Sequence, residues 1–251
     1  MRPKKATLWV VVALLGMGTA TWAQGDVSYE VSGGFFTHYI WRGQTSTDDW
    51  VFQPDVSASW NGFTAGIWGN LDVGNDNGRD GSFTEYDYYL DYSGQFTEML
   101  GYSVGGIYYY FPGGDATAEV YGGVNVDCVA NPALTVYWDF DEVGGIYANF
   151  AVSHSLEYWP DLPFGIDLGA SIGWGDGGYN DDYWGTAARP KVGSELNDLV
   201  LSAAFPFEVG AVTVTPSVTY VSLLGSDVRK SDAYDTDNDV VVAGVTASYN
   251  F

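Results

Sequence analysis

The sequence is short of basic residues, of cysteine and of long apolar segments, and each shortage narrows the fold class. Nine Lys and Arg residues stand against 32 Asp and Glu residues, so we expect no nucleic-acid partner, because phosphate binding needs clustered positive charge. The single Cys128 excludes an intramolecular disulfide framework and a zinc site built from cysteines alone. Aromatic residues make up 17% of the chain and glycine contributes 33 residues, a composition typical of β structure.

The first residues have the pattern of a secretory signal peptide. Arg2, Lys4 and Lys5 precede an apolar run over residues 8–15, and a small-residue site ends at Ala23. We therefore predict a signal peptide over residues 1–23 and a single barrel domain over residues 24–251. Its removal leaves six basic residues against 32 acidic ones, a net charge of −26. No later apolar run is long enough to form a membrane-spanning helix.

Apolar and polar residues alternate in segments of about ten residues, as in the strands of outer-membrane barrels. Short turns such as Asn61-Gly62 alternate with longer loops rich in Asp, Asn, Gly and Ser. This asymmetry predicts an all-β fold, a transmembrane antiparallel up-and-down β-barrel in the bacterial outer membrane, with both termini at the periplasmic end. A soluble sandwich is the less favoured alternative. We predict about twelve strands, with ten or fourteen as alternatives, over residues 27–41, 51–60, 63–72, 83–93, 98–111, 116–127, 134–140, 145–157, 164–174, 195–206, 211–223 and 239–251.

The first predicted strand ends in a basic residue, Arg42. In our register Phe35, Tyr39 and Trp41 face lipid, whereas His38 and Arg42 face the lumen. We predict that Arg42 is the only cation that a strand directs into an acidic lumen. Two roles stay open: Arg42 stiffens the wall by pairing with Asp55 or Asp72, or Arg42 and His38 form a constriction. The predicted lumen set is Arg42, His38, Glu30, Asp55, Asp72, Glu85 and Asp87, with Glu119, Asp127, Asp139, Glu157, Asp167 and Asp198 from later strands.

Two stretches resemble known outer-membrane sequences. Residues 39–46, followed by Gln53-Pro54-Asp55 and by residues 62–70, resemble an uncharacterised family of proteobacterial outer-membrane proteins with the patterns Y-x-x-R-G-x-S, P-x-x-Q and G-F-Y-x-G-x-W-x-S-N. Here Thr64 replaces a Tyr of the last pattern, and Gln53 precedes Pro54 instead of following it. The resemblance implies the fold and the location only. Tyr249 and Phe251 resemble the terminal signal that the barrel-assembly machinery reads.

We predict a narrow porin-like channel for small solutes or cations. The alternative is a non-conducting structural or surface-interaction barrel whose acidic outer loops bind divalent cations. The loop over residues 72–81 has oxygen ligands at alternate positions, including Asp76 and Asp80, and weakly suggests calcium; no other cofactor is expected. Outer-membrane lipids and lipopolysaccharide are the expected partners. We predict no enzyme, because His154 has no hydroxyl two residues away on its own face of the strand.

Overall fold

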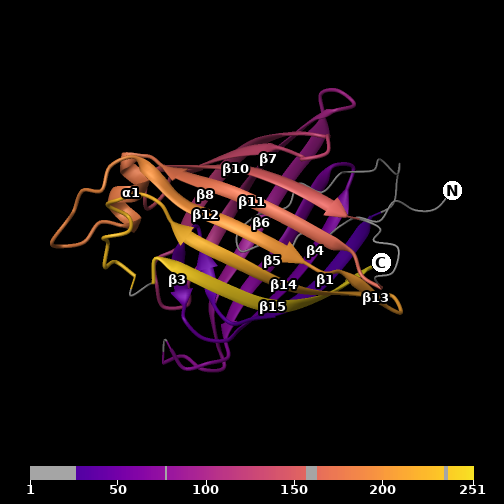
Figure 1. The fold of residues 1–251 in the computed structure, drawn as a ribbon, viewed down its shortest axis with the longest axis horizontal. Coiled ribbons are helices and arrows are strands. Elements are labelled where there is room, and N and C mark those ends of the chain that lie inside the picture. The colour runs from indigo at the N-terminus through magenta and orange to yellow at the C-terminus, as the bar shows by residue number, and fades with distance from the viewer. Residues whose placement is uncertain (1–26, 77, 157–162, 235–236) are drawn as a thin grey trace.

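The computed structural model describes residues 27–76, 78–156, 163–234 and 237–251. The predicted signal peptide and Glu157 therefore lie outside the described residues. Twelve antiparallel strands form the barrel wall, as predicted (Figure 1). They are β1 (Ser28–Phe36), β4 (Val51–Trp60), β5 (Phe63–Asp72), β6 (Ser82–Gln95), β7 (Leu100–Tyr110), β8 (Thr117–Val126), β9 (Ala133–Asp139), β10 (Ile146–Leu156), β11 (Ile166–Gly175), β12 (Glu195–Ala204), β14 (Val212–Leu223) and β15 (Asp239–Asn250).

The wall closes on itself because its ends pair. β1 is hydrogen-bonded to β15, and β12 is hydrogen-bonded directly to β14. The short strand β13 (Phe207–Val209) lies between these two in sequence and pairs with the start of β14. The predicted strand over residues 195–206 ends early at Ala204, since Pro206 has no N–H group to donate to the ladder. Every other wall strand pairs with its neighbour in sequence, which is the up-and-down topology.

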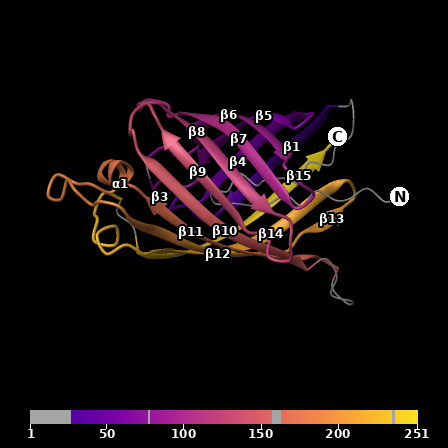
Figure 2. The same ribbon diagram turned by 90° about the horizontal axis from the view of Figure 1, so that it is seen from above.

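Connections of two kinds lie at opposite ends of the barrel (Figures 1 and 2). At the end where β1 begins and β15 ends, Asn61 and Gly62 join β4 to β5 with φ values of 48° and 86°. Positive φ at both central residues is the requirement of the type I′ turn, whose twist matches that of the flanking strands. The longer loops and the helix α1 (Gly177–Tyr183) lie at the other end. Among the described residues no helix is long and apolar enough to cross a membrane.

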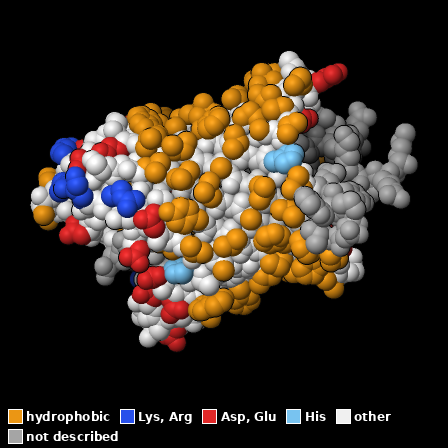
Figure 3. Space-filling model, in the orientation of Figure 1, with side chains coloured by type: hydrophobic (Ala, Val, Ile, Leu, Met, Phe, Trp, Pro, Cys, Tyr) orange, Lys and Arg blue, Asp and Glu red, His pale blue; other side chains and the backbone are white. Residues whose placement is uncertain are grey.

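The outer surface of the wall is apolar and the inner surface is polar. Val31, Phe35 and Leu90 are exposed to 45%, 46% and 55%, and apolar side chains cover the middle of the surface in Figure 3. Polar side chains such as Thr219 and Ser248 are buried on the inner face. A closed sheet satisfies every backbone group of its wall internally, so strands can cross a bilayer in this form. The chain is a β-barrel of the bacterial outer membrane.

The first predicted strand, residues 27–41, is wrong beyond Phe36. β1 ends there, opposite Val51 of β4, and nine residues are enough for a tilted membrane strand. The chain then forms a separate two-stranded sheet from β2 (Tyr39–Trp41) and β3 (Gln44–Thr47), here called the lumen hairpin (residues 39–47). Its residues alternate like those of a wall strand, because the hairpin also has two faces, and period-2 alternation cannot distinguish the two places.

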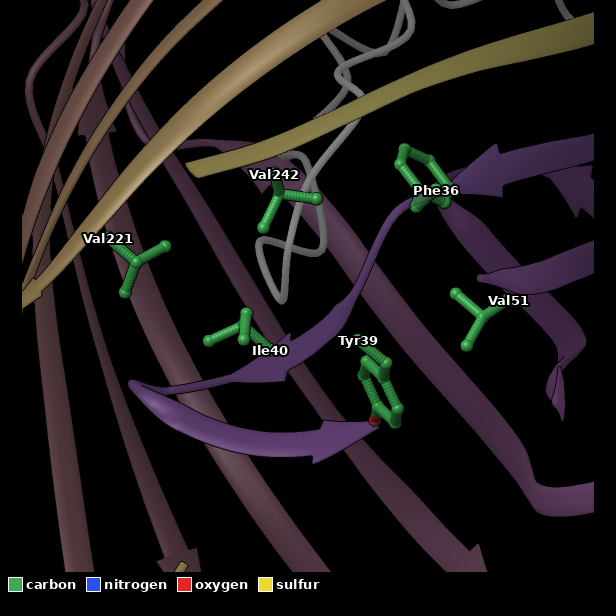
Figure 4. Close-up of a cluster of buried hydrophobic side chains, with 6 residues drawn as sticks. All are labelled: Phe36, Tyr39, Ile40, Val51, Val221 and Val242. Atoms are coloured by element: carbon green, nitrogen blue, oxygen red, sulfur yellow. The ribbon is translucent and has the colours of Figure 1, made fainter. Parts of the chain in front are cut away.

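The lumen hairpin folds inward, and Figure 4 shows it within the ring of wall strands. Ile40 is only 1% exposed and packs in a cluster with Val221 of β14 and Val242 of β15. Tyr39 is 7% exposed and packs against Trp68 of β5 in a tilted arrangement, with ring centroids 5.4 Å apart. The predicted lipid-facing positions of Tyr39 and Trp41 are therefore wrong. The prediction for Phe35 is confirmed.

Candidate functional site

Arg42 lies at the tip of the lumen hairpin, in a conformation that its side chain does not favour. Arg42 and Gly43 have φ values of 49° and 85° and form the two-residue turn between the paired residues Trp41 and Gln44. The turn therefore has the type I′ pattern, in which Asn or Gly is usual at the first position. A non-glycine residue in the left-handed region costs about 1–2 kcal/mol, so contacts of the Arg42 side chain must offset this cost.

The guanidinium of Arg42 forms a two-pronged pair with Glu119 of β8. Nη1 and Nη2 each donate to a different carboxylate oxygen at 2.7 Å. The hydroxyl of Tyr109 on β7 also donates to Glu119, at 2.9 Å. Both charged residues are nearly inaccessible, with 5% of Arg42 and 2% of Glu119 exposed. Such planar bidentate geometry is the strongest form of the arginine–carboxylate contact.

Four aromatic rings surround the same guanidinium. Its Cζ atom lies 4.3 Å from the centroid of Tyr137, 4.4 Å from Trp41, 4.5 Å from Tyr147 and 5.8 Å from Tyr179. We call these four residues the aromatic cage. Each desolvated cation–π contact contributes up to about 2 kcal/mol. Together with the Glu119 pair, these contacts outweigh the backbone cost at Arg42.

The cage lies across the lumen from the base of the hairpin. The hairpin leaves the wall between β1 and β4, while Glu119, Tyr137 and Tyr147 belong to β8, β9 and β10. In the closed order of strands, β9 is six strands from β1 in either direction. The hairpin therefore spans the full width of the lumen, and its tip is held by side chains of the opposite wall.

The helix α1 covers the tip from the loop end. Tyr179 is fully buried against Trp41, Tyr147 and Tyr183, and the Gln44 amide contacts its hydroxyl at 3.4 Å. The side chain of Asp176 caps the helix by accepting from the backbone of Tyr179 at 2.8 Å. Within the described ranges, the hairpin and α1 thus pack against each other at the loop end of the lumen.

Polar contacts also hold the base of the lumen hairpin. The Thr47 hydroxyl donates to Asp72 of β5 at 3.0 Å, and the Asn70 amide donates to the same carboxylate oxygen at 3.0 Å. On β6, Glu85 is buried and lies two residues from Asp87 on the same face of the strand.

Three further carboxylates are held by tyrosines that cross over a glycine. Asp91 of β6, Gly105 of β7 and Tyr121 of β8 lie side by side in the register, and the Tyr121 hydroxyl donates to Asp91 at 2.8 Å. A Cβ atom on Gly105 would lie 2.5 Å from the Tyr121 ring. We call this arrangement a tyrosine strap. Two more straps are Tyr89 over Gly66 to Asp55, and Tyr147 over Gly173 to Asp198.

The straps explain how the wall holds carboxylates with so few cations. Arg42 is the only buried Lys or Arg among the described residues, whereas Asp72, Glu119, Asp139 and Asp198 are all buried acids. Buried charges must be paired or hydrogen-bonded. Glu119 has the guanidinium, and Asp139 accepts from Thr117 and from two loop amides. Hydroxyl groups reduce the cost of burial without cancelling the charge, so the lumen stays acidic.

The structure places most predicted lumen residues on the inner face, but it changes their partners. Glu30 and Asp55 lie half-buried on β1 and β4. The guanidinium of Arg42 donates its hydrogen bonds to Glu119 and not to either of them. The predicted pairing of Arg42 with Asp55 or Asp72 is wrong, because the hairpin carries Arg42 to the opposite wall. Glu119 was among the inward carboxylates that the alternation predicts, but nothing in the sequence marked it as the partner.

His38 does not join Arg42 in a common constriction. Its Nε2 atom lies 3.1 Å from Asp48 and its Nδ1 atom lies 2.8 Å from the Thr37 hydroxyl. These partners belong to the segments that enter and leave the lumen hairpin, so His38 lies at its base. Asp127 also departs from the lumen set, since it follows the end of β8 and is exposed in a turn.

The predicted calcium loop gathers few ligands. Asp76 accepts from the Asp48 amide at 3.1 Å, and Asp80 is exposed. In the part of the chain that the structure describes, no three His, Cys, Asp or Glu residues are close enough to hold a metal ion together. Calcium binding here stays a prediction.

Arg189, Lys191, Arg229 and Lys230 lie in the loops at the barrel end that carries α1. Arg189 and Lys230 both approach Asp227, at 3.1 and 3.6 Å. Lys191 pairs with Asp181 at 2.6 Å, and its side chain is 83% exposed. Basic side chains gather at the loop end in Figure 3, beyond the apolar band.

No protein-family model matches the chain, and no curated protein matches it. Among solved structures it is similar to a NanC porin, with a TM-score of 0.49 and 11% identity over 89% of this chain and 98% of that one. An outer membrane channel from Pseudomonas putida F1 has a TM-score of 0.49 and 8% identity, covering 92% and 97%. A Pseudomonas aeruginosa FadL homologue has a TM-score of 0.43 and 9% identity, covering 89% of each chain. The barrel assignment rests on this chain's own strand pairing.

Proposed function

We propose that the protein is a narrow channel for small solutes or cations, and that the lumen hairpin closes it. The observation that supports this proposal most is the position of the hairpin, which crosses the lumen from β1 and β4 to the Glu119 carboxylate on β8. A segment that only reinforced the wall would lie along it. This one obstructs the only route that a solute could take through the barrel.

The hairpin is built so that it can leave without opening the wall. β2 and β3 form a two-stranded sheet of their own, separate from the barrel sheet. β1 and β4 pair over their whole length, up to Phe36 and Val51. The tip is therefore held by side-chain contacts, chiefly those of Arg42. Local opening of a segment held in this way requires less free energy than unfolding of the barrel.

Charge on the inner wall favours cations. Asp55 and Asp91 are half-buried on the inner face and accept hydrogen bonds from the hydroxyl groups of Tyr89 and Tyr121. Rings of carboxylates select cations in pores. We therefore expect small cations and neutral solutes to pass more readily than anions once the hairpin has moved.

Planar-bilayer conductance of two chains tests the proposal. In the second chain, residues 38–49 are replaced by Asn-Gly, so that a type I′ turn joins Thr37 to Trp50. Thr37 directly follows Phe36 and Trp50 directly precedes Val51, and Phe36 and Val51 are paired, so all twelve wall strands are kept. We expect rare or small openings from the native chain. The variant should show a larger, steady and cation-selective conductance.

Silence of both chains would overturn the channel proposal, provided that circular dichroism shows the variant to be folded. That result would favour the second candidate function, a non-conducting barrel that acts through its outer surface. The specific observation in favour of this alternative is the close packing at the loop end, where Tyr179 and Trp184 are 0% and 1% exposed. In that case the acidic loop with Asp76 and Asp80 is the first candidate for divalent cations, and chelation should lower the thermal stability.

Lipopolysaccharide and the barrel-assembly machinery are the partners that we propose. Arg189, Lys191 and Lys230 lie in the outer loops, where lipopolysaccharide phosphates are found. At the opposite end, Tyr249 and Phe251 are 42% and 62% exposed and stack with ring centroids 5.5 Å apart. An exposed aromatic pair on the last strand supports its reading as an assembly signal. We propose no catalytic role: His154 contacts the carbonyl oxygen of Val129 at 2.7 Å, which is a structural contact.

A further inference from the structure

The groups around Arg42 form a receptor for a guanidinium ion, and the wall supplies most of it. Glu119 and Tyr109 come from β8 and β7, Tyr137 and Tyr147 from β9 and β10, and Tyr179 from α1. Only Trp41 belongs to the hairpin itself. If the tip withdraws, one carboxylate and three aromatic rings stay in place, arranged around the volume that the guanidinium occupied.

We propose that this wall site binds small organic cations that carry a guanidinium group, and that Arg42 occupies it as a tethered ligand in the closed state. This proposal rests on the proposed function in one respect, because in the native chain the hairpin must leave before a solute can bind. A guanidinium-bearing solute would then compete with Arg42, bind at Glu119 and hold the channel open.

The geometry favours a guanidinium over other cations. Both carboxylate oxygens of Glu119 are engaged at 2.7 Å by two nitrogens of one planar group, a contact that an ammonium ion cannot copy. The rings of Tyr137 and Tyr147 lie 4.3 and 4.5 Å from its centre, where a weakly hydrated cation gains most. A divalent metal is disfavoured, because one carboxylate and the phenol of Tyr109 fall short of the six to eight oxygen ligands that calcium takes.

Attachment to the hairpin gives the Arg42 side chain an advantage over free solutes at this site. A side chain attached through a short hairpin has an effective concentration of the order of millimolar. Free solutes at lower concentration therefore compete poorly unless their affinity is higher. The left-handed φ of Arg42 belongs to the turn of the hairpin, so its backbone cost is present whether or not the tip occupies the site. Occupancy of the site would thus depend on the solute concentration outside the cell.

Isothermal titration calorimetry on the purified full-length chain with Arg42→Ala tests the site without any conductance measurement. Methylguanidinium is the main probe, with tetramethylammonium and sodium, both as chloride salts, for comparison. We expect R42A to bind methylguanidinium. It should bind tetramethylammonium more weakly, because that ion has no hydrogen-bond donors, and it should not bind sodium. In R42A/E119Q the affinity for methylguanidinium should fall at least about tenfold, since a charge-assisted bidentate contact is lost.

The native chain is the first control, because its own Arg42 blocks the site and should reduce binding to below that of R42A. The second control is Lys230→Ala, which removes an exposed surface cation and should not create a site. If R42A does not fold, the chain with residues 38–49 replaced by Asn-Gly serves instead, since it keeps Glu119, Tyr137, Tyr147 and Tyr179.

Two results would overturn the inference: no binding of methylguanidinium by either vacated chain, or equal binding by R42A and R42A/E119Q. Failure of the channel proposal looks different. In that case the vacated site binds methylguanidinium in the calorimeter, while the hairpin-replaced chain stays silent in the bilayer.

Discussion

Arg42 and Glu119 are 77 positions apart in sequence, and their side chains meet through two hydrogen bonds of 2.7 Å inside the barrel. This pair joins the tip of an inward-folded hairpin to β8, five strands from β1 in the closed wall. Arg42 is also the counter-charge of the buried Glu119 carboxylate. The stability of the barrel and the closure of the lumen therefore depend on the same two residues.

Glu119→Gln should destabilise the barrel and release the hairpin. Removal of one partner of a buried ion pair leaves the other uncompensated, at a cost of about 3–5 kcal/mol. Urea titration in lipid vesicles, followed by tryptophan fluorescence, measures this cost. The matched control is Asp127→Asn, an exposed carboxylate beyond the end of β8, which should stay within about 0.5 kcal/mol of the native value. Equal effects of the two substitutions would show that the Arg42 pair adds no stability.

Gly105→Ala should break a tyrosine strap. The added methyl group would lie 2.5 Å from the Tyr121 ring and from the Leu90 carbonyl, and overpacking of this kind costs about 1–3 kcal/mol. Gly122→Ala is the matched control in the neighbouring strand, because its nearest atom is the Ser103 carbonyl oxygen at 3.9 Å. Vesicle unfolding should show a loss for the first variant and almost none for the second. A loss that is equal in both would indicate a general intolerance of these strands to alanine.

Asp55→Asn with Asp91→Asn should weaken the preference for cations. Both carboxylates lie half-buried on the inner face and have tyrosine hydroxyls as donors, and neutral amides keep the shape while removing the charge. The substitutions are best made in the chain whose hairpin is replaced, where the current is largest. The reversal potential in a potassium chloride gradient should move toward zero. An unchanged potential would assign the selectivity to carboxylates elsewhere.

Acid should loosen the loop between α1 and β12. The side-chain bond from Lys191 and the backbone N–H groups of Gly193 and Val192 lower the pKa of Asp181 to about 2. Because this pKa lies below the ordinary value of about 4, the bonds stabilise the loop above that value and lose strength as the pH falls through about 2. Hydrogen exchange at Val192 and Gly193, corrected for the intrinsic rate, should show protection at about pH 5 and its loss near pH 2.

Asp181→Ala supplies the control for that measurement. The methyl group accepts no hydrogen bond from Lys191 or from the two backbone N–H groups, so the variant should exchange quickly at both pH values. Protection of Val192 and Gly193 that persists in this variant would mean that other contacts hold the loop.

The sequence predicted most of the wall, and the reason is local. Each wall strand faces lipid on one side and polar groups on the other, so apolar and polar residues alternate along its sequence. The short turns are equally local, as Asn61-Gly62 shows with its two positive φ values. The same periodicity misled at Tyr39 and Trp41, since a hairpin inside the lumen alternates as well.

The identity of the Arg42 partner could be known only from the tertiary structure. The sequence established a lone cation among many carboxylates and the direction in which most of them point. Which carboxylate it meets depends on a chain reversal after Phe36 and on closure of the barrel, which together bring β8, β9 and β10 to face the base of the hairpin. Those are long-range geometric conditions, and no spacing between residues 42 and 119 encodes them. The amino-acid pattern by itself determined an acidic membrane barrel. The three-dimensional fold decided that Arg42 meets Glu119, because only closure of the sheet places β8 within reach of the tip of the hairpin.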